Sequence, residues 1–173
     1  MDTKPTVTFD TSCIYSNEDE KAPRAIRELE RIHAEGRIQI VKTDVLDTEL
    51  GEGNEQLKLK SEEYSEDFGV MVADLSRADH AVAGGSEIDY LLEQIRDTVF
   101  RNLSQMSKKS QARAIRDAMH LATHRMYKRH FFVTRDQRHI IYMRKELEEK
   151  FGIVALTPEE CLARLKPSLD SVS

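Results

Sequence analysis

Four carboxylates in this sequence have positions from which a folded chain could bring them together. Asp10 ends the run TVTFD, Asp136 follows the apolar run FFV, Glu49 lies in TDVLDTEL and Asp117 lies in RDAMHLA. Carboxylates gathered at one point raise each other's pKa, and a bound divalent cation relieves that repulsion. Mg²⁺ and Mn²⁺ prefer such hard oxygen ligands, and either ion can activate water and stabilise charge on a phosphodiester oxygen.

Each acid taken alone has a plainer explanation. An aspartate at a strand end, such as Asp10 or Asp136, is often a turn residue or a helix cap. Asp117 could pair with Arg113 at i,i+4 on one helix. The acids that precede Glu49 in the same run suit a helix N-terminus. The hypothesis of a metal site therefore depends on the four acids acting together.

The segments that would position these acids alternate between strand and helix patterns. The expected strands are residues 6–10, 37–41, 131–135 and 153–156, and the expected helices are 22–36, 43–50, 65–82, 86–103, 111–129, 138–150 and 158–165. This alternation predicts an α/β fold with a parallel sheet covered on both faces. Right-handed crossovers place the strand ends at one edge, so Asp10 and Asp136 should point to the same rim. Asp117 lies just beyond the apolar arc of its helix, from where it can reach that rim.

Charge is unevenly distributed along the chain. The net charge is −5, but residues 107–145 carry 11 basic and 2 acidic side chains, a local charge of +9. A basic segment in an acidic chain is a candidate polyanion-binding surface, and its alternative is a solvated helix face balanced by acidic neighbours. Four arginines of this segment are the expected nucleic-acid contacts: Arg113, Arg116, Arg135 and Arg138.

Other kinds of site find little support. The chain has no zinc-like His/Cys spacing and no glycine-rich phosphate loop. His120 and His124 have i,i+4 spacing that would allow a metal, but the intervening glutamate of a zincin helix is absent. The sequence has neither a membrane-length apolar run nor a signal-peptide pattern, and Cys13 and Cys161 are far apart. These features favour a reduced cytoplasmic protein without membrane contact.

Several motifs, in their order along the chain, carry a family resemblance. They are VTFDTS, VKTDVLDTEL, RDAMHLATHRM, FFVTRDQ and GIVALTPEECLARL, which together span residues 6–165. This set resembles the PIN-domain nucleases, a family that includes the VapC-like ribonuclease toxins. The resemblance implies a three-layer α/β/α sandwich with a central parallel sheet. It also implies cleavage of RNA by an endoribonuclease whose metal ion activates water, and it allows a toxin with a protein antitoxin as partner.

The resemblance also assigns roles to residues. It implies that Asp10, Glu49, Asp117 and Asp136 bind Mg²⁺ or Mn²⁺, with Thr134 in the catalytic group and Thr11 or Ser12 as further polar support. One departure stands out, since members of the family often carry another acid two residues after the last aspartate. Arg138 occupies that position here, which puts a second metal ion in doubt.

The expected domain organisation is one PIN-like nuclease domain over residues 1–166. It includes a helical insertion around 52–105 and ends in a frayed tail at 167–173. A homo-oligomer is also expected. The alternative function is a PIN-like module that binds RNA or protein without cutting, in which the acids would be splayed apart or paired with arginines.

Overall fold

The computed structural model describes residues 4–15, 19–43, 55–67, 69–70, 81–82 and 86–170. The strands within these ranges are β1 (Thr6–Phe9), β2 (Gln39–Thr43), β3 (Ser65–Asp67), β4 (Gly69–Val70), β5 (Ala81–Val82), β6 (Phe131–Val133) and β7 (Ala155–Leu156). The helices are α1 (Arg24–Ala34), α3 (Glu55–Ser61), α4 (Ser86–Val99), α5 (Lys108–Met126), α6 (Arg144–Phe151) and α7 (Pro158–Asp170), with short 3₁₀ turns η1 (Thr11–Cys13) and η2 (Leu103–Gln105).

The main sheet contains five strands in the described part of the chain, in the order β3-β2-β1-β6-β7. Every neighbouring pair of these strands is parallel, as the alternating pattern of the sequence predicts. The chain moves from β1 outward to β2 and β3, and later returns to β6 on the other side of β1. The junction between β1 and β6 is therefore a topological switch point, where parallel sheets bind ligands outside the carboxyl ends of their strands.

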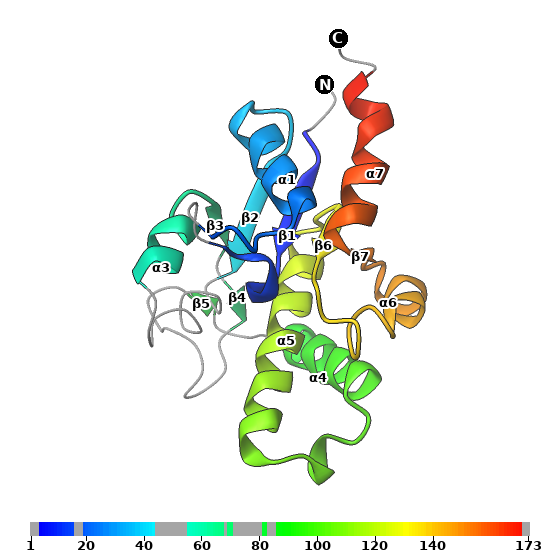
Figure 1. Ribbon diagram of the computed structural model, residues 1–173. Coiled ribbons are helices and arrows are strands. Elements are labelled where there is room, and N and C mark those ends of the chain that lie inside the picture. The colour runs from blue at the N-terminus through cyan, green and yellow to red at the C-terminus, as the bar shows by residue number, and fades with distance from the viewer. Residues whose placement is uncertain are drawn as a thin grey trace.

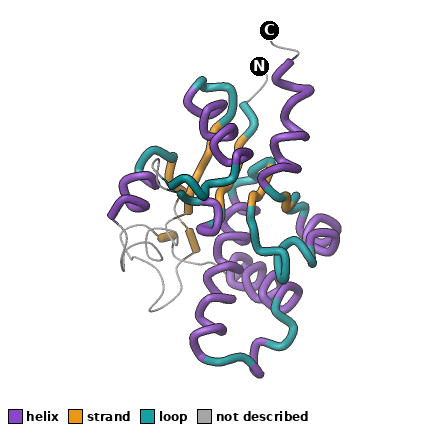
Figure 2. The backbone as a smooth tube through the Cα atoms, in the orientation of Figure 1, coloured by secondary structure: helices purple, strands orange, loops and turns teal. Residues whose placement is uncertain are grey.

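Helices cover both faces of this sheet (Figure 1). Alternate residues of β1 explain why, because Val7 and Phe9 are buried against α1 and α7 while Thr8 faces α5 on the opposite side. The first core cluster joins these strand residues to Ile26 and Leu29 of α1. Figure 2 shows the strands between the two sets of helices. The α/β prediction with a parallel sheet is confirmed, and the two covered faces are compatible with an α/β/α sandwich.

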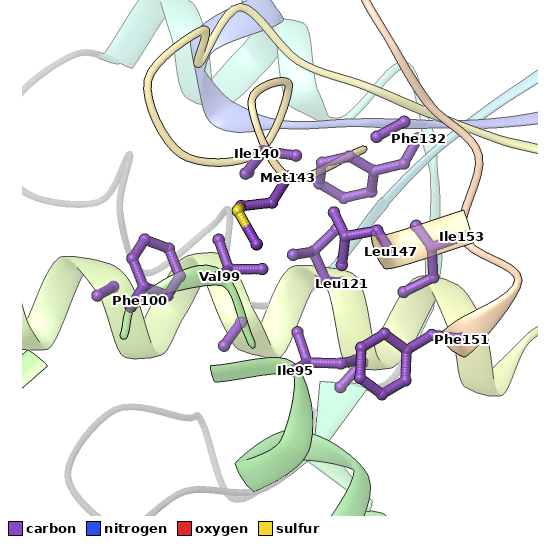
Figure 3. Close-up of a cluster of buried hydrophobic side chains, with 14 residues drawn as sticks. Ile95, Val99, Phe100, Leu121, Phe132, Ile140, Met143, Leu147, Phe151 and Ile153 are labelled. Atoms are coloured by element: carbon purple, nitrogen blue, oxygen red, sulfur yellow. The ribbon is translucent and has the colours of Figure 1, made fainter. Parts of the chain in front are cut away.

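The second core cluster packs α4, α5 and α6 against the other face of the sheet (Figure 3). Phe132 of β6 contributes from the sheet, and Leu121 of α5 and Leu147 of α6 contribute from the helices; all three are fully buried. Phe100, directly after α4, is 3% exposed and belongs to the same cluster. This cluster packs α5 against the sheet, and Asp117 of α5 lines the same cavity as Asp10 and Asp136, which follow β1 and β6.

Two predicted helices begin three or more residues away from their predicted starts. The helix predicted for 138–150 begins only at Arg144, because residues 137–143 form turns in which Ile140 and Met143 are buried and imitate helical periodicity. The helix predicted for 111–129 begins three residues earlier, at Lys108, because the Ser107 hydroxyl accepts a hydrogen bond from the Ser110 N–H. The helix predicted for 43–50 lies outside the described residues, apart from Thr43 at the end of β2.

The predicted tail begins inside a helix. Residues 167–170 continue α7, in which Cys161 and Leu165 are buried, and whether the tail frays stays a prediction. The segment around 52–105 is helical only in part, and the helix predicted for 65–82 is wrong for its described residues, because β3 joins the main sheet and β4 pairs with β5. Whether it is an insertion relative to other proteins stays a prediction. Among the described helices, none combines the length and the apolar character needed to cross a membrane.

Candidate active site

The first carboxylate of the site, Asp10, is held where β1 ends. Its backbone N–H donates to the carbonyl of Val133, which continues the pairing of β1 with β6. Its side chain is only 5% exposed, and its Oδ2 accepts hydrogen bonds from Ser12 Oγ at 2.6 Å and Thr134 Oγ1 at 2.7 Å. Such charge-assisted bonds stabilise a carboxylate that has lost most of its water. Its Oδ1 has no hydrogen-bond partner among the described residues.

Thr134 and Ser12 link the two strand ends into one network. The Thr134 hydroxyl donates to Asp10 and accepts the Asp136 N–H at 3.0 Å, and it is fully buried. The Ser12 hydroxyl likewise donates to Asp10 and accepts the Arg135 N–H at 3.0 Å. The Thr134 hydroxyl therefore couples the position of Asp10 to that of Asp136, and the Ser12 hydroxyl couples Asp10 to Arg135.

Asp136 also fulfils the plainer role of a turn residue. Its Oδ1 accepts the backbone N–H groups of Arg138 at 2.9 Å and His139 at 3.0 Å. Its Oδ2 lies 3.0 Å from Nδ1 of the His139 ring. These contacts fix the carboxylate and terminate the strand, and they leave a carboxylate that is about a quarter exposed.

A cavity of about 1000 Å³ lies in front of this network and unites residues from distant parts of the sequence. Three of the four predicted acids line it, namely Asp10, Asp117 and Asp136. The fourth, Glu49, lies outside the described residues. All four predicted arginines line the same cavity: Arg113, Arg116, Arg135 and Arg138. With Lys109, the basic side chains of the lining outnumber the acidic ones by five to three, which suits an anionic ligand.

No family model, no curated protein and no solved structure matches this chain.

The donor set of the cavity has the right chemistry for Mg²⁺ or Mn²⁺, since all three acids offer hard oxygen atoms. The free Oδ1 of buried Asp10 fits such an ion. Within the described ranges, however, no group of three or more His, Cys, Asp or Glu side chains is close enough to hold a metal. The described carboxylates thus supply suitable ligands without completing a coordination shell.

The two helix histidines considered as metal ligands lie in the protein interior instead. His124 Nδ1 lies 2.9 Å from Thr8 Oγ1, and His120 Nδ1 hydrogen-bonds Thr43 Oγ1. Burial, with nearby His130 and Arg125 contributing less, lowers the pKa of His124 to about 3. Both rings therefore connect α5 to β1 and β2 rather than facing the cavity.

The sequence did not single out several residues that line the cavity. They are Phe100, Met106, Lys109, Ser110, Ala114 and His139. A signal existed for His139, because it follows Asp136 by three residues, the spacing at which a turn brings a side chain back to its capping carboxylate. Phe100 and Met106 carried no such signal, since the turn that joins α4 to α5 brings them to the cavity.

Proposed function

We propose that this protein is a metal-dependent endoribonuclease of the PIN-domain type that cleaves RNA in the cavity at the β1–β6 junction. The observation that carries the proposal is the composition of one cavity: three of the four predicted acids and all four predicted arginines line it. The cavity lies at the switch point of a parallel sheet, the position where folds of this class bind ligands.

The chain's own residues divide the work between holding the ion and holding the RNA. Asp10, Asp117 and Asp136 are the described residues that would hold Mg²⁺ or Mn²⁺, and Glu49 joins them only through the resemblance. When bound, the ion supplies activated water and stabilises charge on the phosphodiester oxygen. Thr134 keeps the Asp10 carboxylate oriented by donating to Oδ2, and Oδ1 would then serve as the ligand of the ion.

The arginines bind and orient the phosphates. Arg113 and Arg116 come from α5, and Arg135 and Arg138 come from the segment after β6, so the two pairs approach the cavity from different elements. The guanidinium of Arg135 lies 5.6 Å from the centre of the Tyr15 ring, a cation–π contact that restricts where it can point. Arginines fixed on two walls would hold the RNA backbone on both sides of the acids.

A second function has a specific observation in its favour. Both oxygens of Asp136 already have partners, and the described acids do not by themselves form a group that could hold a metal. A PIN-like module that binds RNA without cutting would show the same features. The two functions differ in whether a divalent cation changes the fate of bound RNA.

Cleavage of a panel of structured RNAs, with Mn²⁺ and with EDTA, tests the proposal. We expect cleavage by the native protein only with Mn²⁺, loss of cleavage in Asp10→Asn, and full cleavage in Glu149→Gln. Glu149 is the matched control because it is 64% exposed on α6 and does not line the cavity. RNA that is bound but left intact by every protein under both conditions would establish the binding module instead.

A further inference from the structure

We propose that His139 contacts a nucleobase of the bound RNA, its imidazole ring forming a stacking surface next to the arginines that hold the phosphates. This inference rests on the proposed function, because it requires RNA in the cavity. It assigns a role to a residue that neither the sequence patterns nor the resemblance singles out.

The ring of His139 is supported from behind and open in front. Its centre lies 5.4 Å from the centre of the Phe100 ring, with an angle of 43° between the two planes. Phe100 is 3% exposed and belongs to the second core cluster, in which Val99 and Met143 are also buried (Figure 3). The His139 side chain is 42% exposed and lines the cavity. The core therefore supports the ring while the ring remains accessible to a ligand.

The ring is also fixed in orientation. Its Nδ1 lies 3.0 Å from Asp136 Oδ2, and the backbone N–H of the same residue donates to Asp136 Oδ1. A side chain that is already ordered loses little conformational entropy when a ligand stacks on it. The same cavity has an apolar portion formed by Phe100, Met106 and Ala114, which a site for phosphate alone would not need.

The combination of charge and aromatic surface fits a nucleotide better than a phosphate alone. Arginine contacts to phosphates carry no information about the base. Bases of unpaired RNA are recognised by stacking on aromatic rings, histidine included, and by hydrogen bonds to their edges. Arg138 adjoins His139 in sequence and lines the same cavity, so a base stacked on the ring would have its phosphate within reach of a cation.

Two variants separate this role from that of a residue that merely positions Asp136. His139→Phe keeps an aromatic ring and removes the nitrogen that contacts Asp136. His139→Asn keeps a donor for Asp136 and removes the ring. Both retain the two backbone N–H groups that fix Asp136 Oδ1. Melting temperatures of both variants establish that each is folded before binding is compared.

The measurement is the affinity for a single-stranded RNA oligonucleotide in EDTA, where cleavage cannot interfere. We expect His139→Phe to bind within about twofold of the native protein and His139→Asn to bind roughly 5- to 100-fold more weakly, the range for loss of one stacked base. A series of oligonucleotides with one abasic residue at successive positions should show one position that weakens binding to the native protein but not to His139→Asn.

Each contrary result has a distinct meaning. Native affinity in His139→Asn with weak binding in His139→Phe would show that the residue acts only through Asp136. Equal affinity of the native protein for all abasic oligonucleotides would overturn the base contact without any variant. Parallel assays with Mn²⁺ distinguish failure of this inference from failure of the proposed function. Normal cleavage without weaker binding by His139→Asn and without a sensitive abasic position would overturn only the role of His139. RNA that is neither bound nor cleaved would overturn the proposed function.

Discussion

Threonines of neighbouring strands hydrogen-bond ionisable groups at two places in this molecule, with different consequences. At the carboxyl edge of the sheet, Thr134 donates to Asp10, and that carboxylate borders a cavity lined by arginines. Under α5, Thr8 contacts His124, which is 2% exposed and packs edge-on against Phe132. Burial lowers the pKa of His124 to about 3, so that ring is neutral at neutral pH.

The difference shows how residues two positions apart along β1, Thr8 and Asp10, can serve stability and chemistry respectively. Inside the sheet–helix interface the hydrogen bond satisfies a neutral ring, since a charge there would lack water and a counter-ion. At the edge the hydroxyl groups of Ser12 and Thr134 support a carboxylate that ligands can reach. A side chain at the end of the strand is therefore open to ligands, whereas a side chain two residues earlier is enclosed between the sheet and α5.

The largest expected effect comes from Asp136→Asn at the edge. Asn retains an oxygen that can accept from the Arg138 and His139 N–H groups, so we expect thermal stability without metal to hold or rise as repulsion with Asp10 is removed. Cleavage should fall by about 100-fold or more, because a ligand of the ion is lost. Melting curves with and without Mn²⁺ and a cleavage assay measure both quantities. A residue that serves only the turn would show the reverse pattern, with lower stability and unchanged cleavage.

The next effect compares the two threonines directly. Thr134→Val and Thr8→Val are nearly isosteric and remove one buried hydroxyl each, at 0% and 1% exposure. Each should lower the free energy of unfolding by about 1–3 kcal/mol, since a buried polar group loses its partner. Urea unfolding measures this loss. Only Thr134→Val should also reduce RNA cleavage, so equal cleavage by the two folded variants would remove the proposed distinction between the regions.

The smallest expected effect is a pH dependence of stability that arises from His124 of α5. Because the pKa of His124 is lower in the folded chain than its ordinary value of 6.5, the unfolded chain binds more protons as the pH falls below 6.5. The contribution of His124 to the free energy of unfolding is therefore fully present above pH 6.5 and should be smaller by about 1 kcal/mol at pH 5.5. Denaturant unfolding of the native protein and of His124→Gln at several pH values isolates the effect. A variant with the same pH slope as the native protein would show that other groups cause it.

The sequence predicted the parallel sheet and the gathering of distant residues because both follow from local pattern and chain handedness. Apolar runs such as FFV indicate strands, and right-handed crossovers place Asp10 and Asp136 at one edge of the sheet. The local charge of +9 between residues 107 and 145 predicted the four arginines as contacts for a polyanion. Three predicted acids and four predicted arginines lie around one cavity.

The sequence did not predict the start of α6, the place of Phe100 or the partner of His124, because tertiary contacts determine them. Ile140 and Met143 repeat with helical spacing, yet they lie in turns that begin where the Arg138 and His139 N–H groups donate to the Asp136 carboxylate. Phe100 reaches the cavity because α4 packs against α5 in the second core cluster. The pairing of His124 with Thr8 likewise joins residues that are separated by 116 positions in the sequence.

The pairing of β1 with β6 has a further consequence during synthesis of the protein. Asp10 and Thr134 are 124 positions apart, and until residues 131–134 leave the ribosome, β1 lacks one of its two neighbours and Asp10 lacks a donor. Closing so long a loop is entropically unfavourable and slow compared with forming local contacts. The nascent chain therefore completes the hydrogen-bond network of Asp10 only after most of its length has been translated, and the proposed endoribonuclease would not cut the messenger that encodes it before then.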